Sequence, residues 1–184
     1  MTTVLWLLAV QGALGAFDTL YFHEWRARLV ARGPSVHGEL RLHAWRSFIY
    51  AALFAGLAIF AWKGAWTGVL VALLLAEIVI TLADFVIEDR VRKPLGGLFP
   101  GERITHAIMG IIYGAMLAFL IPQLAAWFNE PAGLVAAVDA PAGLKGVVIA
   151  MAVGVFLSAL RDLAATFGTA WARYPWPEVR SDER

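Results

Sequence analysis

The chain has 184 residues, of which 60% are hydrophobic, with a mean hydropathy of +0.70 and a formal net charge of +1. Soluble domains are nearer to half apolar, so this composition indicates an α-helical protein that crosses a membrane several times. The lack of cysteine excludes disulfides, thiolate metal sites and a catalytic cysteine. Nothing indicates nucleic-acid binding, because the arginines lie directly beside the apolar stretches.

Five apolar stretches predict five transmembrane helices. The first covers about residues 3–22 and is interpreted as a retained span rather than a cleaved signal peptide, because no basic segment precedes it. The others cover about residues 39–62, 66–87, 104–120 and 144–163, with Gly- and Pro-containing turns at several boundaries. Each is close to the ~20 residues needed to cross a bilayer. The predicted fold is all-α, with one transmembrane domain over residues 1–172 and a cytoplasmic tail over 173–184.

The distribution of lysine and arginine predicts the orientation in the membrane. Residues 26–46 contain five arginines, residues 90–103 contain three arginines and one lysine, and residues 161–184 contain four arginines. The opposite loops contain only Lys63 and Lys145. The positive-inside rule then places the N-terminus outside and the arginine-rich loops and C-terminus in the cytoplasm. The expected location is a bacterial inner membrane.

A polar pattern at the cytoplasmic ends of the spans occurs twice. Its first copy is Glu24-x-Arg26-x-Arg28 followed by Gly38-Glu39-x-x-x-His43-Ala44, and its second is Glu88-x-Arg90-x-Arg92 followed by Gly101-Glu102-x-x-x-His106-Ala107. A one-residue gap aligns the two copies. The pattern predicts a duplicated helical hairpin, with halves at about 1–63 and 64–128. These halves are expected to form a four-helix bundle to which a fifth span at about 144–171 is added.

The repeated polar residues predict a metal site. Positions i and i+4 share one face of a helix, so each Glu-x-x-x-His can direct both side chains at one centre, and carboxylate with imidazole suits iron, manganese or zinc. We expect two metal ions held by six residues: Glu24, Glu39, His43, Glu88, Glu102 and His106. His23 is expected to point about 100° away from Glu24 on an α-helix, and therefore not to share its metal.

This set of ligands resembles that of the diiron-carboxylate proteins with a ferritin-like four-helix bundle. In those proteins a Glu from each of two helices joins a Glu-x-x-His from each of the other two. The spacing here is one residue longer, and the resemblance covers six residues and the order of the hairpins. It implies iron, with manganese or zinc as alternatives, and an oxidoreductase such as an oxidase, hydroxylase or desaturase. A lipidic or quinone-like substrate fits a site at the membrane boundary.

Ionisable residues inside the apolar stretches are expensive to bury and are therefore functional candidates. Asp18, Asp84 and Asp162 are predicted to be additional ligands or to orient a metal-binding histidine. A buried network with arginine is the alternative interpretation, above all for Asp18 and Asp162.

Glu77 and two tyrosines are predicted to lie deeper in the membrane. Glu77 lies about 16 Å from Glu88 along a helix, which is too far to join the same site. Tyr50 and Tyr113 each follow a repeat histidine by seven residues, on the same helix face. All three are candidates to line a substrate pocket, and packing is the alternative role for the tyrosines.

Other functions remain open at this stage. The carboxylates could cap helices and pair with arginine in a purely structural duplication, or they could form the cation site of a metal-ion or proton transporter. His43 and His106 could instead hold haem b. The chain could also be a non-catalytic subunit of a larger membrane complex or a homo-oligomer, with its eight tryptophans making contacts.

Overall fold

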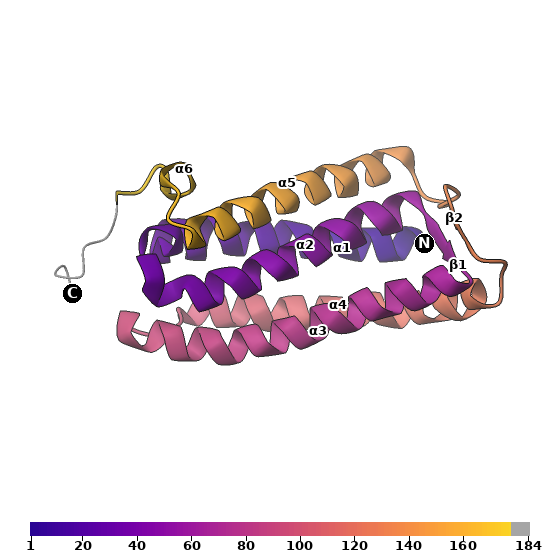
Figure 1. Cartoon of the computed structure of the whole chain (residues 1–184). Coiled ribbons are helices and arrows are strands. Elements are labelled where there is room, and N and C mark those ends of the chain that lie inside the picture. Colours follow the sequence, from indigo (N-terminus) through magenta and orange to yellow (C-terminus); the bar gives the residue numbers. More distant parts are fainter. Residues whose placement is uncertain (178–184) are drawn as a thin grey trace.

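The structure is a computed structural model that describes residues 1–177, so the predicted tail at 178–184 lies outside the described residues. The described part is mostly helical (Figure 1). Its main helices are α1 (Thr2–Phe17), which continues as the π-helix η1 (Asp18–Ala27), then α2 (His37–Ile59), α3 (Ala65–Arg92), α4 (Pro100–Phe128), α5 (Ala142–Thr166) and the short α6 (Ala170–Arg173). Five of these segments are long and apolar enough to cross a membrane, which confirms the predicted number of long apolar helices.

The five long helices run along a common axis (Figure 1). Most contacts of α1 with the repeat helices are to α4, and most of those of α2 are to α3. The helix α5 packs mainly against α2 and also against α1. The helices α1 and α2 touch each other little. Each hairpin therefore contacts the other hairpin more than its own two helices contact each other.

A short β-ribbon closes one end of the helix bundle. Strand β1 (Ala61–Lys63) pairs antiparallel with β2 (Gly133–Val135), and the Lys63 ammonium lies 2.5 Å from the Glu130 carboxylate. Gly64 follows β1 with a φ of +57°, and a Cβ at this position would lie 2.7 Å from the Ala132 Cα. Glycine is required here by both the backbone conformation and the close approach.

The opposite end of the bundle collects the polar repeat. It contains η1, the starts of α2 and α4, and the ends of α3 and α5. The short 3₁₀ turns η2 (Leu29–Ala31) and η3 (Gly33–Val36) lead into α2, and η4 (Lys93–Leu95) precedes α4. Pro100 occupies the first turn of α4, where its missing N–H costs no helical hydrogen bond.

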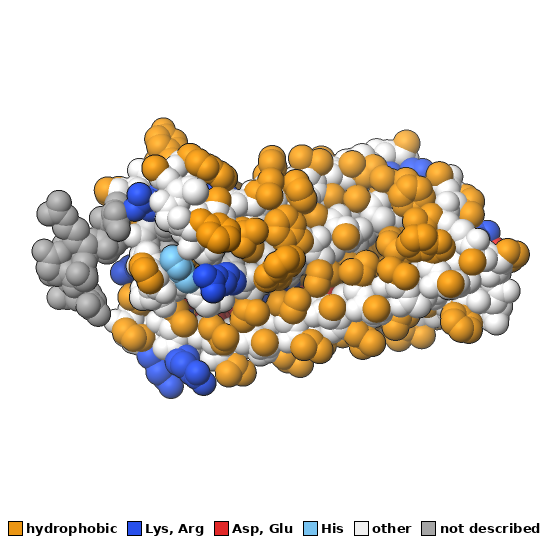
Figure 2. Space-filling model, in the orientation of Figure 1, with side chains coloured by type: hydrophobic (Ala, Val, Ile, Leu, Met, Phe, Trp, Pro, Cys, Tyr) orange, Lys and Arg blue, Asp and Glu red, His pale blue; other side chains and the backbone are white. Residues whose placement is uncertain are grey.

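The outer surface of the bundle is apolar along most of its length. Hydrophobic side chains cover the face seen in Figure 2, and Lys and Arg gather toward the ends. Val79 and Ile111, in the middle of α3 and α4, are 65% and 73% exposed. Apolar surface on this scale is unusual for a soluble monomer, and it fits helices that face lipid.

Candidate metal centre

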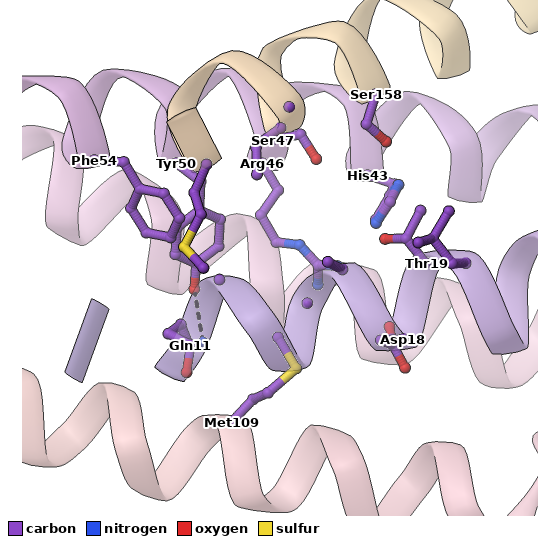
Figure 3. A pocket seen from close by; sticks show the side chains of 17 residues that line it. Gln11, Asp18, Thr19, His43, Arg46, Ser47, Tyr50, Phe54, Met109 and Ser158 are labelled. Carbon is purple, nitrogen blue, oxygen red and sulfur yellow. Dashed lines mark hydrogen bonds between the residues drawn. The ribbon is translucent and has the colours of Figure 1, made fainter. Parts of the chain in front are cut away.

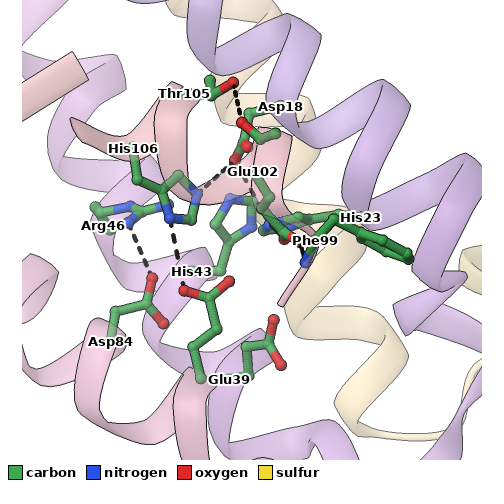
Figure 4. A network of polar contacts seen from close by, with 12 residues as sticks. Asp18, His23, Glu39, His43, Arg46, Asp84, Phe99, Glu102, Thr105 and His106 are labelled. Carbon is green, nitrogen blue, oxygen red and sulfur yellow. Dashed lines mark hydrogen bonds and ion pairs between the residues drawn. The ribbon is translucent and has the colours of Figure 1, made fainter. Parts of the chain in front are cut away.

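Four side chains from two different helices converge at the polar end of the bundle. Asp18 and His23 come from η1, and Glu102 and His106 come from α4 (Figure 4). One ligand atom of each lies within 4.8 Å of those of the other three. His106 Nε2 lies 3.1 Å from Asp18 Oδ2, and His23 Nε2 lies 3.3 Å from Glu102 Oε1. We call these four residues the primary group.

A second group shares His23 with the first. Its other members are Glu39, in the first turn of α2, and Glu88, near the end of α3. Glu88 Oε2 lies 3.7 Å from His106 Nδ1, so the two groups form one continuous polar cluster. We call His23, Glu39 and Glu88 the secondary group.

A buried guanidinium already neutralises part of the secondary group. Arg92 donates from Nε and Nη2 to the Glu39 carboxylate, with the shortest of these hydrogen bonds at 2.7 Å. Its Nη2 also lies 3.3 Å from Glu102 Oε1 and 4.0 Å from Glu88 Oε1. The Arg92 side chain is only 2% exposed. It therefore acts as an internal cation among three carboxylates.

Several buried polar atoms of the cluster have no hydrogen-bond partner among the described residues. They are Asp18 Oδ1, His23 Nε2, Glu88 Oε1 and Asp84 Oδ1. His23 Nε2 has carboxylate oxygens of Asp18 and Glu102 within 3.5 Å, but none in hydrogen-bonding geometry. A buried polar atom without a partner costs free energy. The arrangement fits nitrogen and oxygen atoms that are aimed at a common cation.

The buried side chains at this end of the bundle carry an excess of negative formal charge, which also favours a cation. Seven carboxylates lie buried here: Asp18, Glu24, Glu39, Asp84, Glu88, Glu102 and Asp162. Three arginines pair with them, Arg46 with Asp84, Arg92 with Glu39 and Arg161 with Glu24. Seven negative charges less three positive charges leave four negative charges when histidine is counted as neutral. Buried charges are stable only when they are paired or bind metal.

The π-helical geometry of η1 determines which of its side chains point into the cluster. The Arg28 N–H donates to the His23 carbonyl, five residues back, and Arg28 ends the π-helix with a left-handed φ of +52°. A π-turn brings positions i and i+5 onto one face, so Asp18 and His23 point the same way. His23 was predicted to lie outside the metal site, because on an α-helix it would point about 100° away from Glu24.

Glu24 lies in neither group, although it was predicted to be a ligand. Its Oε2 accepts hydrogen bonds from Arg161 of α5 at 2.8 Å and from the Trp176 indole at 3.4 Å. The π-helix turns Glu24 away from the cluster while it turns His23 inward. Of the six predicted ligands, the structure brings Glu39, Glu88, Glu102 and His106 together.

His43 also lies outside both groups, next to the cluster. Its Nδ1 forms a 2.6 Å hydrogen bond with Asp162 Oδ2 of α5, and its ring packs 4.9 Å from that of His23. Asp162 thus orients a histidine that belongs to neither group, whereas it was predicted to be a ligand or to orient a metal-binding histidine. Asp84 pairs with Arg46 at 2.9 Å, whereas Asp18, expected only as an auxiliary residue, belongs to the primary group.

The predicted capping role of the repeat glutamates is only partly present. The Phe99 N–H donates to Glu102 Oε2 at 3.4 Å, which is a long capping interaction at the start of α4. The Glu39 carboxylate is engaged by Arg92 instead. Capping therefore does not account for the burial of these two side chains.

Two cavities flank the cluster on the side that faces the middle of the bundle. The first, which we call the α5-side cavity, has a volume of about 290 Å³ and reaches Asp18 and His43 from between α1, α2 and α5 (Figure 3). The second, the α3–α4 cavity, has a volume of about 270 Å³ and reaches His106. Both have mostly apolar linings. Apolar cavities therefore reach both helices that carry the primary group.

The predicted substrate-pocket residues line the α3–α4 cavity. Glu77, Tyr50 and Tyr113 surround it together with Gln11 of α1. Gln11 Nε2 donates to the Tyr50 hydroxyl at 3.3 Å, and Thr81 donates to Glu77 at 2.7 Å. Gln11 was not identified from the sequence, because a single amide in an apolar helix carries no spacing signal.

Comparison with known proteins gives no further assignment. A scan against protein-family models and searches of curated proteins and of solved structures found no match to this chain. Its function therefore has to be argued from the polar cluster and the cavities.

Proposed function

We propose that this chain is a membrane-embedded metal protein that binds an ion between Asp18, His23, Glu102 and His106. The observation that carries the proposal is the convergence of four ligand atoms, three of them on buried residues and the fourth on the half-buried His106, within 4.8 Å of one another. Two carboxylates and two imidazoles are a donor set suited to non-haem iron, manganese or zinc. Buried atoms without partners and an excess of buried negative charge support the same conclusion.

The primary group is proposed to hold one ion, where the repeat alone predicted two. The secondary group is bridged by the Arg92 guanidinium, which contacts Glu39 and lies near Glu88. Two cations cannot share these carboxylates without repulsion, so Arg92 takes the place of a second metal. A dinuclear centre would require Arg92 to leave Glu39.

The proposed activity is that of an oxidoreductase acting on a lipid-soluble substrate. Iron bound at the primary group would supply one-electron chemistry. Within the chain, His106 would be held by the stacked Phe85 ring at 5.4 Å and by Asp18. The two apolar cavities would admit a substrate from the bilayer and keep bulk water away from the cluster.

The proposed location is a bacterial inner membrane, with the polar cluster at the cytoplasmic side. This orientation is supported by the arginines at that end of the bundle and by the scarcity of lysine and arginine at the β-ribbon end. The N-terminus would then lie outside, and α5 would end in the cytoplasm.

Elemental analysis of protein purified in detergent without added metal tests the proposal. We expect about one iron, manganese or zinc ion per chain, lost when His106→Ala removes an imidazole. His37→Ala is the matched control, because His37 is at the start of α2 and belongs to neither group. No stoichiometric metal in the wild type, or equal loss in both variants, would overturn the proposal.

A further inference from the structure

The α3–α4 cavity contains polar groups that the metal centre does not use. The Tyr113 hydroxyl and Gln11 Oε1 are buried and have no hydrogen-bond partner among the described residues. Glu77 is 2% exposed, lines the same cavity and accepts a hydrogen bond from the Thr81 hydroxyl. A donor and an acceptor without partners thus belong to residues that line one apolar cavity at membrane depth, where unsatisfied polar groups are costly.

Aromatic and flexible side chains line this cavity beside Arg46, Ile78, Thr81, Leu82 and His106. The rings of Tyr50 and Tyr113 meet edge to face, with centroids 6.2 Å apart, and Phe85 and Met109 also line the cavity. Aromatic and thioether side chains pack favourably against a flat ring. The lining therefore fits a planar molecule better than a bare acyl chain.

The size of the cavity limits what it can enclose. Its volume of about 270 Å³ lies just below the range of pockets that enclose whole small molecules. Gly110 lies at the exposed side of the cavity, and a Cβ added there would meet no atom within 4 Å. A head group can enter at this point while an attached hydrocarbon tail stays in the lipid.

We propose that the α3–α4 cavity binds the ring of a lipid-soluble quinone or quinol. The Tyr113 hydroxyl would donate to a ring carbonyl, and Gln11 Oε1 would accept from a ring hydroxyl of the reduced form. A quinol ring satisfies both atoms, since its hydroxyls donate and accept, and a quinone ring satisfies the Tyr113 hydroxyl; neither form buries another charge. A fatty acid would instead bring its carboxylate near Glu77, and like charges at this depth repel, while Arg46, which also lines the cavity, is already paired with Asp84.

The inference rests on the proposed function, because it names the class of substrate that would approach the metal. His106 lines the same cavity and belongs to the primary group. Tyr113 lies seven residues further along α4, which is about 10 Å along the helix axis. A ring bound between Tyr113 and His106 would therefore lie next to His106, which is a proposed metal ligand.

The test is equilibrium binding of a benzoquinone with a single isoprenoid unit to the full chain in detergent, followed by tryptophan fluorescence. Tyr113→Phe should weaken binding roughly threefold to tenfold, as expected for one lost hydrogen bond. Gly110→Leu should weaken it by at least about tenfold, because the side chain fills the opening. Gln11→Leu should leave the affinity for the benzoquinone within about twofold, because a quinone carbonyl has no proton to donate, and should weaken binding of the matching quinol roughly threefold to tenfold.

Two control variants make the same kind of substitution at positions that do not line the cavity. Gly114→Leu alters the same helix at an exposed glycine that lines neither cavity, and Tyr21→Phe removes a hydroxyl at the polar end. Both should bind like the wild type. Equal affinity in Gly110→Leu and Gly114→Leu, or no binding by the wild type, would overturn the inference.

Metal content measured on the same samples separates this inference from the proposed function. Quinone binding with the expected pattern in a protein without metal would retain the cavity as a quinone site and overturn the metal centre. A bound metal without quinone binding would overturn the inference and leave the metal centre standing. Melting temperatures of all variants exclude unfolding as the cause of a lost signal.

Discussion

The two copies of the repeat have similar sequences and different geometry. In the second copy the end of α3 is α-helical, so Glu88 faces the cluster and Arg92 reaches Glu39. In the first copy the end of α1 is a π-helix, so Glu24 turns to Arg161, and Arg28 lies over the Trp176 ring at 4.6 Å. The two copies of one sequence pattern therefore contribute residues at different positions of the pattern to the cluster. The type of helix determines which residues share a face.

The largest expected effect is a difference in the stability of two variants, at Arg92 and at Arg28, which occupy the same position in the two copies of the repeat. Arg92→Met removes the buried cation from Glu39, Glu88 and Glu102, which should cost about 3–5 kcal/mol of the free energy of unfolding. Arg28→Met loses only an exposed stacking contact, worth about 0.5–1 kcal/mol. Unfolding titrations with dodecyl sulfate, followed by circular dichroism, measure both.

Arg92→Met also tests the role of Arg92 as an internal cation. With the guanidinium gone, added divalent metal should restore part of the lost stability and raise the metal content toward two ions per chain. Equal stability of Arg92→Met and Arg28→Met would contradict the account. A metal content that stays at one ion would remove the secondary group as a site.

Substitution of Glu88 and of Glu24, which occupy the same position in the two copies, should have different effects on the metal affinity of the protein. Glu88→Gln alters a carboxylate that lies next to His106 and should weaken metal binding by roughly 10–100-fold. Glu24→Gln alters a residue that pairs with Arg161, so its metal affinity should change by less than about threefold. Competition with a chromophoric chelator measures both affinities, and a larger loss in Glu24→Gln would reverse the interpretation of the two copies.

The fold was largely predictable from composition and charge. Five apolar stretches with Gly- or Pro-containing boundaries mark helices directly, since hydrocarbon tolerates few other structures. The β-ribbon at Ala61–Lys63 and Gly133–Val135 was not predictable, because each strand has only three residues. The position of α5 over α1 and α2 also depends on packing that no single stretch reveals.

The site was predictable only as far as the helices follow an α-helical period. Glu39, Glu88, Glu102 and His106 were identified from i,i+4 spacing and equal depth. His23 and the central position of Asp18 were missed, because they depend on the π-helix. The only sign of the π-helix in the sequence was the five-residue spacing between Asp18 and His23, because positions i and i+5 do not share a face of an α-helix. The main contact of Arg92 is Glu39, 53 residues away, which no local spacing indicates.

The smallest expected effect concerns the histidine that the repeat predicted to be a ligand. Asp162→Asn keeps an acceptor near His43 Nδ1 and removes the charge, which should lower stability by about 1 kcal/mol. Metal affinity should change by less than about threefold, because neither His43 nor Asp162 belongs to the two groups. Thermal unfolding and chelator competition check both expectations. A tenfold loss of metal affinity would make His43 a ligand after all.

The most direct test of the metal centre compares two neighbouring histidines whose rings lie 4.9 Å apart. Metal content is measured by elemental analysis in His23→Ala and His43→Ala, purified side by side. The structure predicts that His23→Ala loses the metal and that His43→Ala retains it. Retention in His23→Ala together with loss in His43→Ala would contradict the proposed centre and favour the α-helical ligand set of the sequence repeat.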